Sequence, residues 1–531
     1  MRPEDRQRIQ DDVVTRVVER HVTRARAASD SLLEMLIHDT LYHERLRLER
    51  DDPRRPAVRA DSTFYQEIRR QLRHASAADL QTILERLARH FVAGVAGNFD
   101  ERIYRLSTRV LPIGLTVLLS AMSPRRLLEL RAIRAGLPQH IRTQGAVEDV
   151  RALLDHGTLV VVPTHVSNLD SLLLGYAGFL MGLPPLLYGA GLNLFSNPLF
   201  SFFMRNLGAY RVDRRKSAAL YKEVLKEYAT RSLEMGYHNV FFPGGTRSRS
   251  GVVEQRLKKG LLGTAVRAYV ENLRTGRPRP NVYIVPCTLS YKLVLEAETL
   301  IDDHLKEAGK ARYIIEDDEF SRPRRVLQFI SNLMSLDAQV VVTFSLPQDV
   351  VGNRVDREGH SLDRRGRRVD VRSYVLRHGQ PVHDEQRDAE YTHELEAEIR
   401  RDYLRDNVLM STHVVARALL DLLRSANPGM DLYRLLHTGG TAASFPMAAM
   451  HAEVQRLLVA LQRLPEGPRF GEELRGGDVQ EVVADALKHF AIYHTQPAAL
   501  RHGDRVFHQA RRLLLYYANR CEGYDLRAPG S

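Results

Sequence analysis

The sequence has 531 residues, of which 44% are hydrophobic and 27% charged, and these proportions exclude a disordered chain, a collagen and a coiled-coil rod. Lys and Arg number 77 against 65 Asp and Glu, and this net charge of +12 suggests an anionic partner such as nucleic acid, acidic lipid or a phosphorylated substrate. The only cysteines, Cys287 and Cys521, cannot build a zinc cluster or a disulfide framework, which favours a reducing compartment.

Residues 1–150 are predicted to form a helical N-terminal region. Ser76 and Asp79 have the spacing of a capping box at the start of a helix. Apolar residues follow at helical spacing from Leu80 to Phe91. We therefore expect a helix that buries one face.

Residues 151–350 are predicted to form an α/β domain. Short β-branched runs begin at Thr158, Asn239, Asn281 and Gln339, and helical stretches such as the one from Ser217 separate them. Strands that alternate with helices indicate an α/β domain with a largely buried sheet. Residues 351–531 form a mainly helical C-terminal extension, so the expected fold is a central α/β domain flanked by helical regions.

An uncharged stretch runs from Ser171 to Met204 and is long enough to span a bilayer. Pro184, Pro185 and Pro198 interrupt it, which favours a soluble or membrane-surface protein over an integral one. The stretch is expected either to line an acyl groove and a membrane-contacting surface, or to form two buried helices around a turn.

The first candidate for chemistry is THVSNLD, which contains His165 and Asp170 and follows the apolar run that ends at Pro163. On one regular helix these two side chains would point about 140° apart. They can meet only if His165 lies in a loop and Asp170 in the first helical turn, with Ser167 or Asn168 as the N-cap. An imidazole held by a carboxylate is suited to act as a general base. The alternative is a surface histidine and an aspartate at a helix N-terminus.

The second candidate is FFPGGTRSRSG, from Phe241 to Gly251, which offers two glycines, hydroxyl groups and the guanidinium groups of Arg247 and Arg249. Such groups bind phosphate monoesters, although an ordinary surface turn has the same composition. The clusters GAYRVDRR from Gly208 and LKKG from Leu257 are each more often solvated charges than sites.

In their order and spacing, these blocks together resemble the glycerolipid acyltransferases with the H-x4-D motif, which esterify glycerol phosphate with an acyl thioester. The third block is similar to the FPEGTRS form of 1-acylglycerol-3-phosphate acyltransferases and to the FVEGGRSRTG form of glycerol-3-phosphate acyltransferases. Arg249, Ser250 and Gly251 favour the second form. The resemblance extends from about Gly97 to about Arg424.

The resemblance implies a role for each matching residue. The catalytic base would be His165 and its orienting carboxylate Asp170. The expected substrate-binding residues are Arg214, Gly245, Arg247, Ser248 and Lys259. The chain departs from the family at Gly244, where both forms have Glu, and at Asp213, where the second form has Arg. If Gly244 has a positive φ, a side chain there would be strained.

The sequence therefore predicts transfer of a fatty acyl chain from acyl-CoA or acyl-carrier protein to the sn-1 hydroxyl of glycerol-3-phosphate, the first step of phospholipid biosynthesis. Neither a metal nor a redox cofactor is expected. The alternatives are 1-acylglycerol-3-phosphate or dihydroxyacetone phosphate as acceptor, or a catalytically silent lipid- or phosphate-binding protein. A nucleic-acid-binding protein is disfavoured because no recognition motif accompanies the charge. The basic residues between Arg205 and Arg215 suggest peripheral binding to an anionic membrane, at the cytoplasmic face.

Overall fold

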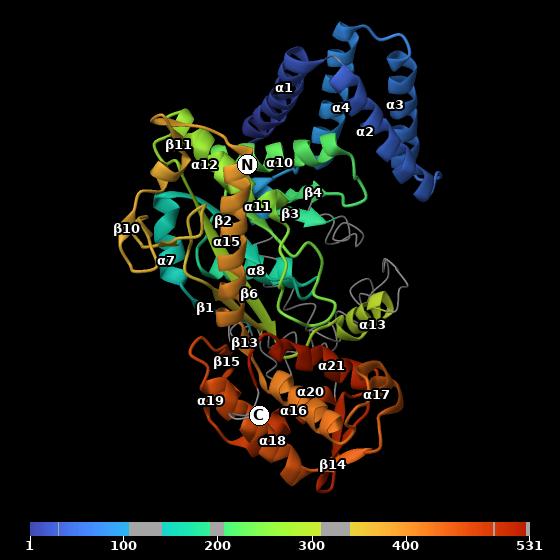
Figure 1. Ribbon diagram of the computed structural model, residues 1–531, viewed down its shortest axis with the longest axis vertical. Helices are drawn as coiled ribbons and strands as arrows, with labels where there is room; N and C mark the ends of the chain where they lie inside the picture. Colours follow the sequence, from blue (N-terminus) through green and yellow to red (C-terminus); the bar gives the residue numbers. More distant parts are fainter. Residues whose placement is uncertain (30, 106–140, 192–205, 309–339, 492–493, 527–531) are drawn as a thin grey trace.

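The computed structural model describes residues 1–29, 31–105, 141–191, 206–308, 340–491 and 494–526. Four N-terminal helices lie at one end of the molecule, a seven-stranded sheet with its helices lies in the middle, and a second helical region lies at the other end (Figure 1). This arrangement confirms the predicted α/β domain with helical flanks.

Within residues 1–95, apart from residue 30, the N-terminal region forms α1 (Pro3–Ala28), α2 (Ser31–Arg50), α3 (Pro56–Leu72) and α4 (Ala77–Val95). The predicted capping box is present, since the Ser76 side chain accepts the Asp79 N–H and the Asp79 side chain accepts the Ser76 N–H. The apolar face of α4 is buried, and it shares one hydrophobic cluster with α1 and with α10 (Ala219–Glu234) of the central domain. The N-terminal helices are thus packed onto the central domain rather than separate from it.

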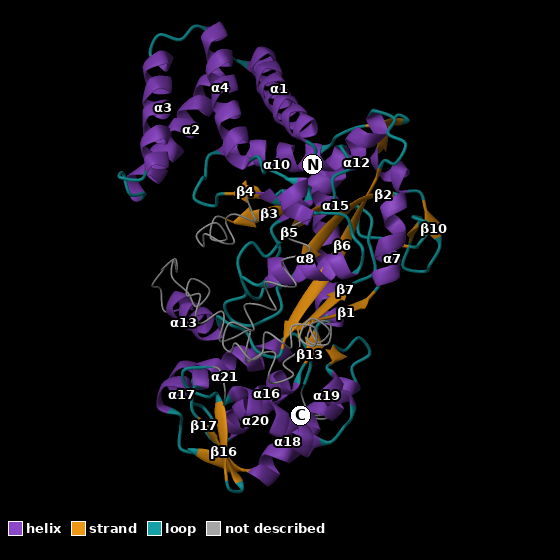
Figure 2. Ribbon diagram, turned by 180° about the vertical axis from the view of Figure 1, so that it is seen from behind, coloured by secondary structure: helices purple, strands orange, loops and turns teal. Residues whose placement is uncertain are grey.

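The central sheet has the order β1-β7-β6-β2-β5-β3-β4, and every neighbouring pair is parallel except β6–β7. Its strands are β1 (Ile141–Gly145), β2 (Gly157–Pro163), β3 (Leu187–Gly191), β4 (Tyr210–Val212), β5 (Asn239–Phe241), β6 (Asn281–Tyr291) and β7 (Val340–Phe344). Figure 2 shows these strands together in the middle of the molecule. The sheet begins before the expected boundary at residue 150, because β1 pairs with β7.

Helices cover both faces of this sheet. Among the described residues of the central domain these helices include, besides α10, α7 (Val147–Ala152), α8 (Asp170–Leu180), α11 (Lys259–Leu262), α12 (Thr264–Arg274) and α13 (Ala297–Ala308). Alternate residues of β2 enter different clusters: Leu159 and Val161 pack in the cluster that contains α8, whereas Val160 and Val162 pack in the cluster that contains α12. Burial on both faces explains why β2 is a continuous apolar run.

The C-terminal region is mainly helical, as expected. Its helices are α15 (Glu385–Asp406), α16 (Ser411–Ser425), α17 (Leu432–Thr438), α18 (Met447–Gln462), α19 (Glu472–Arg475), α20 (Val479–Phe490) and α21 (Arg511–Ala518). Short strands accompany them: β8 (Arg354–Val355), β9 (Ser361–Leu362), β10 (Arg368–Val369), β11 (Leu376–Arg377), β12 (Gln380–Pro381), β13 (Val408–Leu409), β14 (Ser444–Pro446), β15 (Arg469–Phe470), β16 (Ala499–His502) and β17 (Arg505–His508). Helix α15 belongs to the cover of the sheet, since the Tyr403 hydroxyl donates to the Val162 carbonyl at 2.8 Å.

The uncharged stretch begins as α8 and continues into β3, and residues 192–204 lie outside the described residues. Its described second half is therefore a strand of the sheet and not a second helix. Most of α8 is buried, but Phe179 and Leu180 at its end are 47% and 43% exposed. Among the helices of the described residues, none has both the length and the apolar character needed to cross a bilayer.

Strands β2, β5, β3 and β4 are neighbours and run parallel, so their carboxyl ends lie at the same edge of the sheet. The segments that follow them carry His165, the Gly244–Gly245 pair and Arg214. This edge is where open α/β sheets bind ligands. The topology thus brings together three sequence blocks that are up to about 80 residues apart.

Candidate active site

His165 and Asp170 are in direct contact. His165 lies in the loop after β2, Asp170 is the first residue of α8, and His165 Nδ1 is 2.8 Å from Asp170 Oδ2. The predicted arrangement of one residue in a loop and the other in the first helical turn is therefore present. The expected N-cap is not, because Leu169 occupies that position. The Ser167 hydroxyl instead accepts the Leu169 N–H at 3.2 Å.

The Asp170 side chain is fully buried and accepts several hydrogen bonds. The N–H groups of Val166 and Ser167 donate to its Oδ2 at 2.6 and 3.0 Å, and the Tyr291 hydroxyl donates to its Oδ1. Both oxygens of this carboxyl group act as hydrogen-bond acceptors, and Oδ2 accepts two backbone N–H groups. His165 Nδ1 must therefore carry the proton of this tautomer, which leaves the lone pair of Nε2 available to take a proton.

The His165 residue is fixed at its backbone as well as at its ring. Its carbonyl accepts the Ser248 N–H at 2.7 Å, and its N–H donates to Glu254 Oε1 at 2.5 Å. The imidazole stacks on the Phe242 ring with centroids 4.3 Å apart. All three contacts come from the segment after β5, so this segment and the His165 loop form one unit.

Burial lowers the pKa of His165 below its usual 6.5, and the nearby Arg247 and Arg214 guanidinium groups lower it further, against the opposing effect of Asp170. The imidazole is consequently neutral at pH 7. A neutral imidazole whose tautomer is fixed by a carboxylate is a general base for a hydroxyl group.

Arg247 forms an ion pair with a buried carboxylate. Its Nη1 is 3.4 Å from Glu296 Oε1, and the Glu296 side chain is fully buried. Glu296 also accepts the Ser167 hydroxyl at 2.8 Å and the Asn168 N–H at 3.0 Å. Arg247 therefore stabilises the loop that carries His165 through Glu296, in addition to placing positive charge near His165.

Arg214 differs from Arg247 because it is exposed and has no hydrogen bond or ion pair with any of the described residues. Desolvation and the charges of Arg247 and Arg249 lower its pKa. Lys258 lies close by, and the pKa of its ammonium group is lowered by desolvation and by Arg214. Arg247 and Arg249 have carboxylate partners, whereas Arg214 and Lys258 form no ion pair with any of the described residues, so the place between these two cations favours an anion.

The N-terminal helices hold the segment that carries Arg214. Arg215 Nη1 is 2.7 Å from Asp51 Oδ1 at the end of α2, and Lys216 Nζ is 3.8 Å from Glu44 Oε2 within α2. Asp213 is buried and accepts the Arg215 N–H at 3.0 Å. Asp213, one of the two departures from the family pattern, thus has a structural role here.

The remaining predicted site residues, Ser248, Gly245 and Lys259, take part in contacts that stabilise the loop or point away from His165. Ser248 donates its hydroxyl to the Val252 carbonyl at 2.6 Å, which stabilises the loop. Gly245 has φ +78°, and its N–H donates to the Phe242 carbonyl at 3.0 Å, so it forms the turn. Lys259 points to α15, where its Nζ is 3.4 Å from His393 Nδ1. Lys258 is the lysine that lies over Gly245.

Gly244 does not have the positive φ that the sequence allowed, and the left-handed residue is Gly245. What constrains Gly244 is a neighbour, since a Cβ placed on it would lie 3.1 Å from Glu254 Cγ. Burial raises the pKa of Glu254 to about 7. Glu254 was not identified from the sequence. Its only distinguishing feature in the sequence is that it is the one acidic residue between Gly245 and Lys258.

The C-terminal region also reaches the site. The Asn519 side chain donates to the Ser250 carbonyl at 2.9 Å, and the buried Arg520 donates to the Leu289 carbonyl at 2.9 Å. These contacts hold the loop after β5 and the end of β6. The site is thus built from all three regions of the chain.

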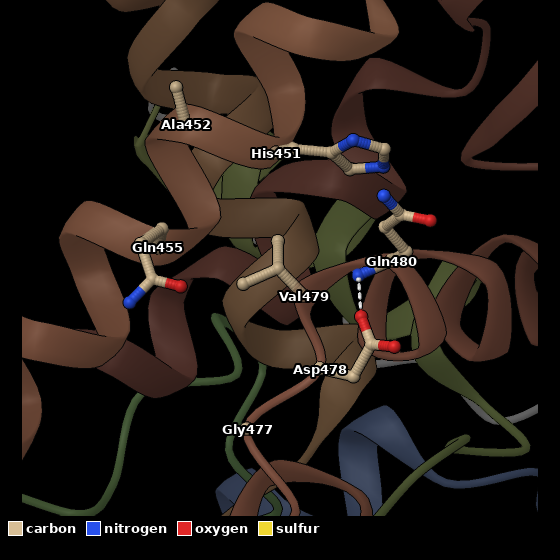
Figure 3. Close-up of a pocket in the computed structure, with 7 residues that line it drawn as sticks. All are labelled: His451, Ala452, Gln455, Gly477, Asp478, Val479 and Gln480. Atoms are coloured by element: carbon tan, nitrogen blue, oxygen red, sulfur yellow. Dashed lines mark hydrogen bonds between the residues drawn. The ribbon is translucent and has the colours of Figure 1, made fainter.

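A surface hollow and a cluster of three possible metal ligands lie elsewhere in the described residues, and an aspartate in each is used in local structure. A hollow of about 400 Å³ in the C-terminal region is lined by His451, Ala452, Gln455 and residues 477–480 (Figure 3). Its Asp478 is used as a helix cap, accepting the Gln480 N–H at 2.8 Å. The hollow shares no residue with the His165 site.

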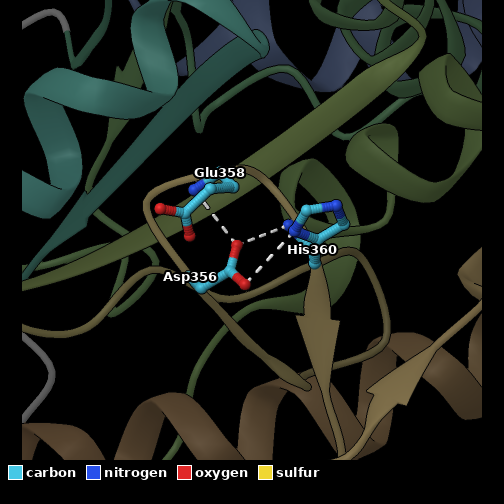
Figure 4. Close-up of side chains that lie close together, drawn as sticks. All are labelled: Asp356, Glu358 and His360. Carbon is cyan, nitrogen blue, oxygen red and sulfur yellow. Dashed lines mark hydrogen bonds and ion pairs between the residues drawn. The ribbon is translucent and has the colours of Figure 1, made fainter.

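Asp356, Glu358 and His360 lie together in a hairpin turn (Figure 4). Asp356 Oδ1 accepts the N–H groups of Glu358 and His360 at 3.1 and 2.8 Å. These bonds are those of an aspartate that stabilises its own turn. The grouping is therefore explained by the backbone without a metal ion.

Comparison with known proteins agrees with this geometry. Residues 142–290 match the family model described as Acyltransferase. This segment contains β1 to β6 and the His165–Asp170 pair. The similarity to this family therefore covers the part of the chain that holds the candidate site.

The curated proteins that the chain resembles are glycerol-3-phosphate acyltransferases, which confirms the resemblance seen in the motifs. Identity is 31% over 207 residues with that of Pseudomonas putida (strain W619), covering 39% of this chain and 23% of the relative. The sequence identity with the glycerol-3-phosphate acyltransferase of Pseudomonas syringae pv. tomato is 32% over 202 residues, which cover 38% of this chain and 22% of the relative. With that of Pseudomonas aeruginosa (strain LESB58) it is 27% over 374 residues, covering 70% and 39%. The matched part of the chain thus spans well under half the length of these relatives.

Proposed function

We propose that this protein transfers a fatty acyl chain from acyl-CoA or acyl-carrier protein to the sn-1 hydroxyl of glycerol-3-phosphate, the first step of phospholipid biosynthesis. The observation that carries the proposal is the neutral, fixed imidazole of His165 beside Arg214 and Lys258. A base beside a cluster of cations suits an acceptor that has both a hydroxyl and a phosphate. The similar Pseudomonas proteins are glycerol-3-phosphate acyltransferases, which supports the same acceptor.

In the proposed reaction, His165 Nε2 takes the proton of the acceptor hydroxyl while its oxygen attacks the thioester carbonyl. Asp170 stabilises the resulting imidazolium through Nδ1–H. The carbon–sulfur bond then breaks, and the departing sulfur takes the proton from Nε2 as a thiol. General-base catalysis is expected to contribute a factor of roughly 10²–10⁴ to the rate enhancement, and positioning of the substrates should contribute much of the remaining factor.

The acceptor is tested by incubating the purified full chain with a labelled acyl donor and each of three acceptors in turn. We expect glycerol-3-phosphate to give the highest kcat/KM, above 1-acylglycerol-3-phosphate and dihydroxyacetone phosphate. His165→Ala should lower the rate at least about 100-fold because the general base is lost. The control is His437→Ala, an exposed histidine of α17.

A preference for one of the other two acceptors would contradict the assigned substrate. If the wild type acylates no acceptor but still binds glycerol-3-phosphate, the chain is the catalytically silent binding protein instead.

The two arginines are expected to respond differently to substitution. Arg214→Ala should raise the KM for glycerol-3-phosphate about 10- to 100-fold, since a charge-assisted contact to phosphate is worth about 1.5–3 kcal/mol. The melting temperature and the donor KM should change little, because Arg214 has no partner among the described residues. Arg247→Ala should lower the melting temperature as well, because it leaves Glu296 buried without its cation.

Lys258→Ala and Lys259→Ala form a matched pair for the same assay, since only Lys258 lies over Gly245. A larger acceptor KM in Lys259→Ala than in Lys258→Ala would refute this placement of the phosphate.

We further propose that the protein acts as a peripheral protein at the cytoplasmic face of the membrane. Of the basic residues expected to bind lipid, Arg205 lies outside the described residues and Arg215 is ion-paired with Asp51. Support comes instead from exposed Phe179 and Leu180 at the end of α8, the helix that starts at Asp170. These two side chains lie at the other end of α8, about 15 Å along the helix from Asp170, and exposed apolar side chains suit contact with a lipid surface.

Replacing Phe179 and Leu180 with Ser should reduce co-sedimentation with vesicles of anionic phospholipid, because apolar contact with the bilayer is lost. Activity on a short-chain, water-soluble acyl donor should be preserved. Unchanged sedimentation of the double variant would contradict the placement of the membrane at this helix.

A further inference from the structure

Glu254 crowds the place that a Cβ on residue 244 would occupy. A Cβ placed on Gly244 would lie 3.1 Å from Glu254 Cγ, 3.4 Å from its Oε1 and 3.6 Å from its Cδ. Gly244 has an ordinary backbone conformation, so its lack of a side chain is explained by this neighbour and not by φ. Gly244 and Glu254 therefore form a complementary pair, in which one residue makes room for the other.

The Glu254 carboxyl group is directed to the backbone of the base. Its Oε1 accepts the His165 N–H at 2.5 Å, while the Ser248 N–H donates to the His165 carbonyl at 2.7 Å. Residues of a single loop thus hold both polar backbone groups of His165. The Oε2 atom is buried and has no hydrogen-bond partner among the described residues.

Charged groups from other elements surround this carboxyl group. Arg520 from the C-terminal region acts on it as a nearby cation, and Asp170 as a nearby anion. Arg520 is itself buried and donates to the Leu289 carbonyl. Glu254 is therefore electrostatically coupled to Asp170 and to Arg520 as well as bonded to the His165 backbone.

We propose that Glu254 is a positioning residue for His165, supplying from the loop after the two glycines a carboxylate in the space beside position 244. A glutamate at position 244 would have its carboxylate only two bonds beyond its own Cβ, and thus in the same small space. A glutamate introduced at position 244 and Glu254 would then be alternative sources of one carboxyl group beside the His165 backbone. The kinetic test rests on the proposed acyl transfer.

The test moves the carboxylate between the two positions. Glu254→Ala should lower kcat at least about 10-fold with the acceptor KM changed less than about twofold, because a displaced base affects the chemical step. Glu254→Gln should retain most of the activity, since its amide oxygen can still accept the His165 N–H. Gly244→Glu alone should lower kcat and the melting temperature, because it crowds Glu254 and adds a second carboxylate.

The double variant Gly244→Glu/Glu254→Ala decides the proposal. Its kcat should be at least about 10-fold higher than that of Glu254→Ala, because a carboxylate again lies beside His165. Gln255→Ala, an exposed neighbour, is the control and should behave as wild type. A Glu254→Ala variant with wild-type kcat, or a double variant no faster than Glu254→Ala, would overturn the proposal.

A second readout does not depend on acyl transfer. The rate at which diethyl pyrocarbonate modifies His165, followed by mass spectrometry, reports the exposure and basicity of its ring. Glu254→Ala should change this rate at least about threefold, and Glu254→Gln should not. If the wild type acylates no acceptor but shows this pattern, the proposed function fails while the positioning role stands; equal rates in all three proteins would overturn the positioning role.

Discussion

The hydrogen bond between His165 and Asp170 is the interaction on which the rest of the site depends. It fixes the tautomer of the imidazole and leaves Nε2 as the free base. Two backbone N–H groups and the Tyr291 hydroxyl in turn hold the Asp170 carboxylate. The pair is possible only because the chain leaves β2 in a loop and enters α8 at Asp170. Proximity on a single helix could not have produced this contact.

Parallel neighbouring strands bring the other groups to this pair. The loop after β5 fixes His165 at its backbone and its ring, and the segment after β4 carries Arg214. The N-terminal helices hold that segment through Asp51, and the C-terminal region holds the β5 loop through Asn519. The two helical flanks are therefore part of the support of the site and not independent attachments.

The sequence predicted the features that have a strong local signal. The apolar runs correctly predicted strands β2, β5, β6 and β7, and the capping box correctly predicted the start of α4. Strands β1, β3 and β4 were not predicted, since they contain glycine or charged residues and are defined by pairing with distant strands. The spacing of His165 and Asp170 was sufficient to state the condition under which they could meet.

Features that depend on long-range packing could not be predicted. Nothing local to Arg247 shows that Glu296 would pair with it, and the adjacent Lys258 and Lys259 could be distinguished only by the direction in which each side chain points. In the sequence, Gly244 indicates the loss of a glutamate, because the residue that crowds its Cβ position, Glu254, is ten positions later in the chain. The resemblance to a family suggested which chemistry to expect, whereas the structure identified the partners of each group.

The central claim is that His165 is a neutral base at pH 7, held by Asp170, and its direct test is the pKa of His165. NMR titration of protein with labelled histidine can measure it, with the signal assigned by its loss in His165→Ala. The account predicts a pKa below 6.5 in the wild type and a lower one in Asp170→Asn, because the carboxylate opposes the effect of burial. A pKa above 7 in the wild type, or one that Asp170→Asn leaves unchanged, would contradict it.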